Sequence, residues 1–135
     1  MRRRQYLALA VLASIPLASS FAQTYPAKPL RLLIGTAPGG GTDAIGRMIA
    51  DALAPILKQP VVVENKPGAG GILASEQLMR STPDGYTLFL AQNGHTTNPA
   101  FYKKLPYDTL KDFTPIASVA MSPLVVVASN GSGVK

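Results

Sequence analysis

The stretch TAPGGGTDAIGRMIADAL, residues 36–53, joins three consecutive glycines to an amphipathic segment. From position 45 onward its apolar side chains recur every three or four residues, which predicts a helix with one buried stripe. The stripe consists of Ile45, Met48, Ile49, Ala52, Leu53 and Ile56. Thr42 is the expected N-cap, Asp43 suits the positive end of the helix dipole, and Pro55 is expected to bend or end the helix one turn early. A glycine run at a helix start offers free N–H groups, so this stretch is a candidate anion site.

Strands and helices alternate on either side of this helix. Short apolar or β-branched runs predict strands buried in a parallel sheet at 30–35 and 61–65. A second glycine-rich loop, a weaker helix, a turn, a third strand and a helix with Asn98 as cap and Pro99 at its first position follow. These segments lie at 65–71, 72–81, 82–85, 86–91 and 98–102. Strand-like runs come last, at 116–121 and 124–129, so the predicted fold class is α/β with a parallel-rich sheet and flanking helices.

The first 22 residues have the composition of a secretory signal peptide. Arg2, Arg3 and Arg4 precede an apolar run that is short for a membrane span and is interrupted by Pro16. Small residues before Gln23 favour cleavage there and export to the periplasm, and both the general secretory and the twin-arginine routes fit the charged start. Loss of three arginines leaves 13 − 3 = 10 cations against 7 acids, so the net charge falls from +6 to +3.

The composition of the mature part argues against several functional classes. Its cations are scattered and have no interleaved aromatic residues, so a nucleic-acid partner is not expected. The chain has no cysteine, and its single histidine, His95, has no paired carboxylate, so neither a metal site nor a cofactor is expected. An enzyme would have to use Ser75 or Thr42 with His95, and no third group orients that pair, so no catalytic residue is predicted.

Three anions compete for the glycine run. A nucleotide triphosphate is disfavoured because Gly41 stands where the phosphate-loop pattern requires lysine. A dinucleotide matches the pattern G-x-G-x-x-A at 39–44, with Glu64 as the ribose-binding acid, but residues 36–38 separate the glycines from the strand. A carboxylate remains, and it is the anion that accounts for more than one loop.

Loops that follow neighbouring parallel strands meet at one edge of a sheet. The glycine loops Gly39–Thr42 and Ala69–Gly71 therefore face the same ligand if both strands are placed as predicted. Backbone N–H groups and the Thr42 hydroxyl can donate to a carboxylate without a buried cation, which favours modest and reversible affinity.

Five stretches of the mature chain, taken in order, resemble a known family. They are PAKPLRLLIGTAPGGGTDAIGRMIADAL, PVVVENKPGAGGILASE, TPDGYTLFLA, HTTNPAFYKKLPYDTLKDFTPIA and SPLVVVAS. The chain is similar to the extracytoplasmic solute receptors of tripartite tricarboxylate transporters, of the Bordetella-uptake type. The resemblance implies a type II periplasmic-binding fold with two lobes that close on a small carboxylate and deliver it to a membrane permease. Members of this family are longer, so residues 23–122 are expected to form most of a first lobe and 123–135 the crossover to a second.

The same resemblance assigns the carboxylate-holding turns to residues 38–43 and 67–71. The loop at 93–98 is expected to approach the ligand from the third strand and to help choose it. The predicted ligand-binding residues are Pro38, Gly39, Gly40, Gly41, Thr42, Asp43, Ala69, Gly70, Gly71, His95, Thr96 and Asn98. Asp43 is expected to hold its loop in shape, because an acid repels a bound carboxylate. His95 is expected to pack its loop or to select the ligand.

The predicted partners are a small carboxylate and the membrane permease of the transporter. The mature protein is expected to be a monomer without a membrane span. Two alternatives stay open: a secreted, Rossmann-like enzyme that binds a dinucleotide, and a ligand sensor for a signalling kinase.

Overall fold

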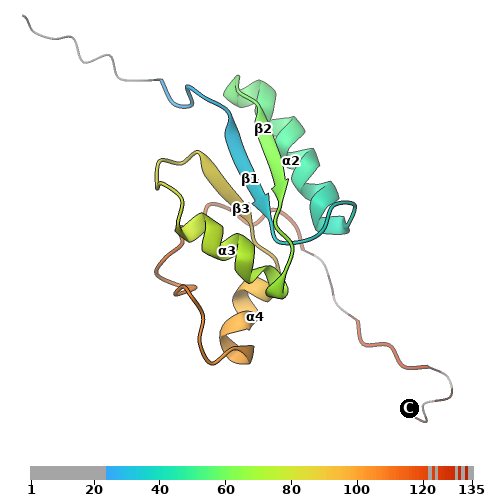
Figure 1. The fold of residues 1–135 in the computed structure, drawn as a ribbon. Helices are drawn as coiled ribbons and strands as arrows, with labels where there is room; N and C mark the ends of the chain where they lie inside the picture. Colours follow the sequence, from blue (N-terminus) through green and yellow to red (C-terminus); the bar gives the residue numbers. More distant parts are fainter. Residues whose placement is uncertain (1–23, 122, 124, 130, 132, 134–135) are drawn as a thin grey trace, which may run out of the picture.

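The computed structural model of the chain describes residues 24–121, 123, 125–129, 131 and 133. The predicted signal peptide at 1–22 lies outside the described residues. Strands and helices alternate along the described part, as Figure 1 shows. In chain order they are β1 (Leu30–Ile34), α2 (Gly41–Leu57), β2 (Val61–Asn65), the 3-10 helix η1 (Ala69–Gly71), α3 (Ile72–Met79), β3 (Thr87–Leu90) and α4 (Asn93–Phe101). None of these helices combines the length and the apolar character that crossing a membrane requires.

The three strands form one parallel sheet in the order β2-β1-β3 (Figure 1). Leu32 of the central strand lies opposite Val63 of β2 and Leu88 of β3. From β1 the chain moves through α2 to β2, then crosses back past β1 through α3 to β3. Because both crossovers are expected to be right-handed, opposite directions of travel place α2 and α3 on opposite faces of the sheet. The predicted α/β class with a parallel sheet is confirmed.

Contacts from β1 agree with helices on both faces. A Cβ atom added to Gly46 of α2 lies 2.3 Å from Ile34, whereas one added to Gly35 lies 3.7 Å from the Cβ of Ala74 in α3. Ile34 at the end of β1 and Gly35 directly after it therefore face different helices. This is why β1 is apolar at every position except Arg31: Leu30 is 2% exposed, and Leu33 and Ile34 are fully buried.

Helix α2 buries a different stripe from the one predicted. Its buried residues are Asp43, Gly46 and Ala50, whereas Met48 and Ile56 are 70% and 73% exposed. The small side chains at 46 and 50 let the helix approach the sheet closely, and a count of large apolar residues overlooks them. The face is therefore set by how near the backbone comes to β1 and β2, and not by hydrophobicity alone.

The predicted N-cap of α2 is wrong, and the helix does not end at Pro55. The N-cap is Gly40, without a side-chain hydrogen bond, and Thr42 lies inside the first turn. The helix continues through Pro55 to Leu57 before Lys58 adopts the left-handed conformation. A proline in the last turn removes only one backbone hydrogen bond, close to the end of the helix, so the helix tolerates it.

The prediction for the fourth helix is also wrong. Helix α4 begins at Asn93, Pro99 lies inside it, and Asn98 is buried instead of capping it. The polar residues 93–97 carry no apolar repeat from which the start of the helix could be predicted. The start is fixed instead by the packing of α4 against the second glycine loop.

The two strand-like runs at the end of the chain do not form strands among the described residues. Residues 116–121 have no strand assignment, and neither have the described residues 125–129 of the second run. Their side chains stand in solvent, with Met121 94% and Val125 80% exposed. A strand requires hydrogen bonds to a neighbouring strand, and no strand of the described part pairs with these segments.

Candidate functional site

Three loops meet at the carboxyl edge of the sheet. They follow β1, β2 and β3 and lead into α2, η1 and α4. Since all three strands are parallel and β1 lies in the middle, the crossovers diverge at this edge, where open α/β sheets hold their ligands. The predicted placement of the two glycine loops at one edge of the sheet is therefore correct.

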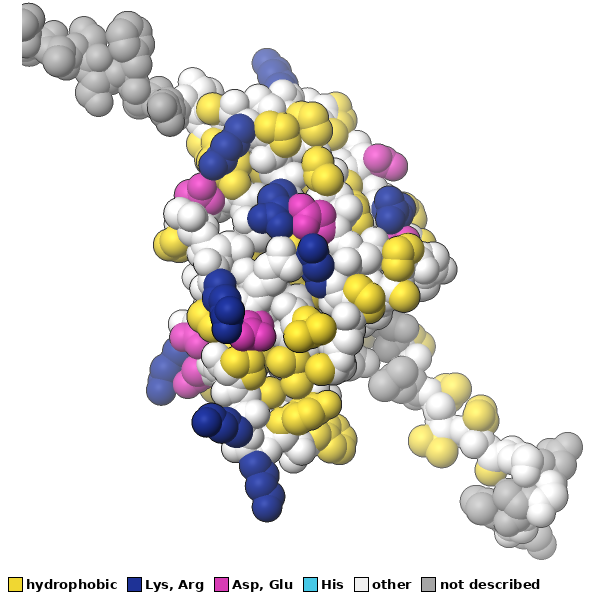
Figure 2. All heavy atoms as spheres, in the orientation of Figure 1, with side chains coloured by type: hydrophobic (Ala, Val, Ile, Leu, Met, Phe, Trp, Pro, Cys, Tyr) yellow, Lys and Arg dark blue, Asp and Glu magenta, His cyan; other side chains and the backbone are white. Residues whose placement is uncertain are grey.

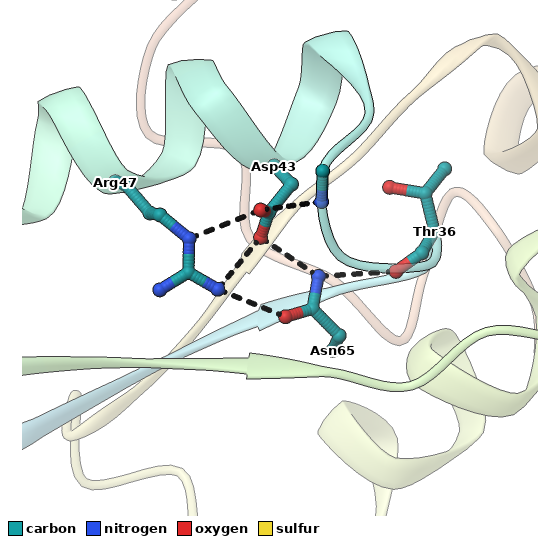
Figure 3. Close-up of polar contacts among 5 residues, drawn as sticks. Thr36, Asp43, Arg47 and Asn65 are labelled. Atoms are coloured by element: carbon teal, nitrogen blue, oxygen red, sulfur yellow. Dashed lines mark hydrogen bonds and ion pairs between the residues drawn. The ribbon is translucent and has the colours of Figure 1, made fainter.

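A network centred on Asp43 holds the first loop (Figure 3). One Asp43 oxygen accepts hydrogen bonds from the Gly39 N–H at 2.9 Å and from Arg47 Nε at 3.0 Å. The other accepts from Arg47 Nη2 at 3.1 Å and from Asn65 Nδ2 at 2.9 Å. Asn65 Nδ2 also donates to the Thr36 carbonyl oxygen at 3.1 Å, which ties the loop to the end of β2.

These donors keep Asp43 ionised. Hydrogen bonds from Arg47, then from the Gly39 backbone and from Asn65, lower the pKa of Asp43 to about 2. Its side chain is buried and both oxygens are occupied, so the carboxylate shapes the loop and has no oxygen to offer a ligand. The sequence did not single out Arg47 or Asn65, although the i, i+4 spacing of Asp43 and Arg47 is a signal for such a pair.

The outer part of the first loop is free to meet a ligand. Pro38, Gly39, Gly40 and Gly41 are exposed, and Thr42 is half-buried at the start of α2. No side chain caps the N-terminus of this helix. Its first N–H groups and the positive end of its dipole therefore point toward the edge of the sheet where the loops meet.

The second loop has an unusual backbone. Gly68, Ala69, Gly70 and Gly71 all have positive φ angles, of 131°, 46°, 64° and 87°. Ala69 is the costly member, because a residue with a Cβ atom rarely adopts this conformation. Ala69 and Gly70 are exposed, whereas Gly71 is buried and donates its N–H to the Gly68 carbonyl at 3.0 Å.

Gly35 marks the point where the three loops touch. A Cβ atom there lies 2.9 Å from the Cα of Gly71 in the second loop and 2.9 Å from Nε2 of Gln92 before α4. Both distances are shorter than real Cβ contacts, so only glycine fits between the loops. The sequence did not single out Gln92, which lies in the third loop as the N-cap residue of α4.

The predicted site residues of α4 divide into two groups. Thr96 is exposed, and its hydroxyl donates to the Asn93 carbonyl at 2.9 Å. His95 and Asn98 are 9% and 4% exposed and point into the protein. Asn98 Nδ2 donates to the Gly70 carbonyl at 3.2 Å, so this residue supports the second glycine loop from behind.

His95 packs in an aromatic cluster. Its ring lies 5.6 Å from that of Phe89, 5.7 Å from that of Tyr107 and 4.7 Å from that of Phe113. Ser75 Oγ and His95 Nδ1 are 2.9 Å apart, and burial lowers the pKa of His95. Ser75 is fully buried and no carboxylate hydrogen-bonds to the imidazole among the described residues, so the pair lacks both an orienting acid and access to a substrate.

Glu64, the acid on which the dinucleotide alternative depends, is engaged elsewhere. Arg31 Nε and Nη2 donate to its two oxygens at 2.6 and 2.9 Å, and these bonds lower the pKa of Glu64. The described residues also contain no group of three potential metal ligands. Cations are dispersed over the face in Figure 2, and several lie beside an acidic side chain.

Two cavities lie away from the glycine loops. One of about 540 Å³ opens at the opposite end of the strands, between Lys28, Arg31 and Arg80, and one of about 330 Å³ lies beside Tyr107 and Leu110. The candidate site is thus the edge of the sheet formed by the three loops that lead into α2, η1 and α4, and neither of these cavities lies there.

The sequence of this chain matches a family of known proteins. The model of the tripartite tricarboxylate transporter family receptor, TctC, matches residues 45–135. A UPF0065 protein of Bordetella pertussis is 44% identical over 131 residues, which cover 95% of this chain and 38% of that protein.

Two solved structures share the fold. The periplasmic binding protein BugD is 41% identical, with a TM-score of 0.66 over 68% of this chain and 31% of its own. MatC from Rhodopseudomonas palustris, solved with bound malate, is 38% identical, with a TM-score of 0.67 over 70% of this chain and 33% of its own. The chain spans about two fifths of the length of the curated relatives that it matches. It belongs to the tripartite tricarboxylate transporter receptor family, and its fold matches one part of the longer periplasmic binding proteins.

Proposed function

We propose that this chain supplies one side of a periplasmic receptor site that captures a small carboxylate with two or three acid groups. The observation that carries the proposal is the pair of exposed glycine turns at one edge of the sheet, the first of which opens into the uncapped N-terminus of α2. Backbone N–H groups at such a place bind anions. The malate in the related MatC structure and the family description support a carboxylate as the anion.

The first loop attracts the anion without relying on a free cation. Arg47 is paired with Asp43, so the first loop carries almost no net charge, and the attraction comes from backbone dipoles. Dipoles and a hydroxyl hold a carboxylate less firmly than a buried arginine does. This suits a receptor, which has to release its ligand, better than it suits a permanent ligand site.

The remaining parts of the proposal concern the whole protein. The signal peptide at 1–22 is removed on export, the mature protein binds its ligand in the periplasm, and the bound form delivers it as a monomer to the membrane permease of the transporter. Residues 23–122 form part of a first lobe, and residues 123–135 lead toward a second lobe that closes over the ligand. The role is binding and delivery, without catalysis, as the receptor family description supports.

The first test is a titration followed by amide spectra of the ¹⁵N-labelled chain, with malate and longer dicarboxylates as ligands and NAD and ATP as controls. Such spectra detect dissociation constants in the millimolar range, about −4 kcal/mol, which suffices for one side of a site. Shifts of the amides at 39–42 and 69–71 with a carboxylate are expected. If these amides stay in place, or if NAD moves them, the carboxylate site is wrong.

A pair of variants at Gly40 makes the test sharper. The position has room for a side chain, because an added Cβ lies 3.8 Å from its nearest neighbour, the Ala37 carbonyl, and φ is −81°. Gly40→Asp introduces a good N-cap, so it preserves or stabilises the fold while its charge repels a carboxylate and occupies the helix N–H groups. Gly40→Ala adds bulk without charge. Binding is expected to be lost in the first variant and retained in the second; equal binding in both contradicts the proposal.

A further inference from the structure

The inner face of α4 packs against the second glycine loop at the carbonyl group of Gly70. Asn98 Nδ2 donates a hydrogen bond to this oxygen at 3.2 Å. A Cβ atom on Gly94 lies only 2.5 Å from it, so the helix backbone is pressed against the same peptide group. Because Gly70 has a positive φ of 64°, the direction of this carbonyl is not fixed by an ordinary helix or strand geometry. Helix α4 fixes it.

His95 anchors α4 to the rest of the protein. It lies one turn before Asn98 on the same face, and both side chains are buried. Its Nδ1 is 2.9 Å from Ser75 Oγ of α3, and its ring packs against Phe89 of β3 and Phe113. A single side chain thus connects α4 with α3, with the sheet and with the segment after α4.

The surroundings of His95 favour a neutral imidazole. The groups that face it are the Ser75 hydroxyl and the rings of Phe89, Tyr107 and Phe113, none of which is a carboxylate or a cation. No carboxylate or cation of the described residues forms a hydrogen bond or ion pair with the ring. A proton added here creates a buried charge without a counter-ion, which is costly.

We infer that Asn98 and His95 are positioning residues for the carboxylate site: Asn98 orients the Gly70 loop, and His95 holds the helix of Asn98 in place while its imidazole is neutral. The inference rests on the proposed function for its effect on the ligand, but not for the coupling between His95 and the loop. Both side chains are buried in this arrangement, although the sequence pattern placed both residues among those that bind the ligand.

The sign of the pH effect follows from burial. Burial lowers the pKa of His95 below its unfolded value of about 6.5, so its contribution is complete above that pH and is lost as the pH falls through the folded pKa. Carboxylate affinity is therefore expected to fall on acidification, by up to about tenfold per pH unit for one coupled proton.

The ligand-free experiment uses the fact that His95 is the only histidine of the chain. Its imidazole resonances give its protonation midpoint directly, and the amides of Gly70 and Gly71 are followed in the same titration. They are expected to shift with the same midpoint in the wild-type chain and to stay still in His95→Asn, which keeps a hydrogen-bonding atom near Nδ1 but does not titrate. If the Gly70 and Gly71 amides of the wild-type chain do not shift at the protonation midpoint of His95, the inference is overturned, even if the variant does not fold.

The ligand experiment measures malate affinity between about pH 8 and pH 5 in both proteins. Malate itself titrates in this range, and the comparison removes that common contribution. A steeper fall in the wild-type chain than in His95→Asn supports the inference, and identical profiles overturn it while leaving the receptor function intact. If malate binds to neither protein, the proposed function fails, and the ligand-free titration still decides the coupling.

A second variant isolates Asn98. Asn98→Asp keeps the size of the side chain but replaces the donor to the Gly70 carbonyl with an acceptor, so weaker malate binding and a displaced Gly70 amide are expected. Ala100→Ser, at an exposed position of the same helix, is the matched control. An Asn98→Asp variant that folds and binds malate as the control does overturns the role of Asn98.

Discussion

Replacing Gly94 by alanine tests the contact between α4 and the second glycine loop. Gly94 is the second residue of α4, and its Cβ position is 2.5 Å from the Gly70 carbonyl oxygen. An ordinary contact begins at 3.4 Å, so α4 and the loop have to separate by about 0.9 Å (3.4 − 2.5). The obstacle is backbone, and no side-chain rotation relieves it.

The expected cost is large for one methyl group. Overpacking of this kind costs about 1–3 kcal/mol, and the Asn98 bond to Gly70, already 3.2 Å long, is broken by the same movement at a further cost of about 1 kcal/mol. Alanine in place of glycine also favours a helix by up to about 1 kcal/mol. Gly41→Ala is the control for this gain, because Gly41 also lies in the first turn of a helix and has no neighbour within 4 Å of its Cβ position.

Urea unfolding followed by far-ultraviolet circular dichroism measures both variants. Gly94→Ala is expected to be less stable than Gly41→Ala by about 2–4 kcal/mol, which corresponds to a difference in Tm of roughly 4 °C for each kcal/mol. Equal stabilities refute the reasoning, since they mean that the loop moves aside freely and that α4 does not determine its shape.

Three smaller predictions follow from individual hydrogen bonds. Asp43→Asn removes the ionised acceptor of the Gly39 N–H, so the amide shifts that a carboxylate induces are expected to weaken. In the wild-type chain this loop is expected to loosen only as the pH falls toward the Asp43 pKa of about 2. Amide exchange of Gly39 measures the loosening of the loop in the variant and in the wild-type chain. Glu64→Gln is expected to cost less than about 1 kcal/mol in thermal unfolding, because the side chain of its partner Arg31 is 42% exposed and water screens the ion pair. NAD is expected to have no effect on this variant, and a gain or loss of NAD binding contradicts this. Tyr86→Phe removes the hydroxyl that accepts from the Ala27 N–H at 2.8 Å, so a loss of about 1 kcal/mol and faster exchange at Ala27 are expected, and unchanged exchange refutes it.

The alternation of strands and helices was predictable because it depends on local patterns. Short apolar or β-branched runs identified β1, β2 and β3, and glycine-rich or turn-forming stretches identified the loops between them. The helix ends and faces were less predictable. Thr42 has the chemistry of a cap but lies two residues after the actual N-cap, Gly40. Helix α2 buries Gly46 and Ala50 because they fit against the sheet, which no hydrophobicity count reveals.

The candidate site shows the same division. The i, i+4 spacing of Asp43 and Arg47 is visible in the sequence, whereas the contact of Asn65 with Asp43 joins residues 22 positions apart. His95 and Asn98 were predicted near the ligand because they follow the third strand, and both are buried behind the loop. Which side of a helix faces the ligand depends on the packing of α4 against α3 and the loop, and the polar sequence at 93–98 has no periodicity from which to infer it.

By itself, the sequence determined the parallel α/β organisation, the two glycine turns at one edge of the sheet and the receptor family. Strand burial, backbone freedom and the order of motifs depend on residues that lie close together in the chain, so they can be inferred from it. The tertiary structure alone decided that Asn65 also holds Asp43, that three loops touch at Gly35, and that His95 and Asn98 lie buried behind the second glycine loop. These features arise from contacts between elements distant in the chain, whose geometry is fixed only when the helices pack on the sheet.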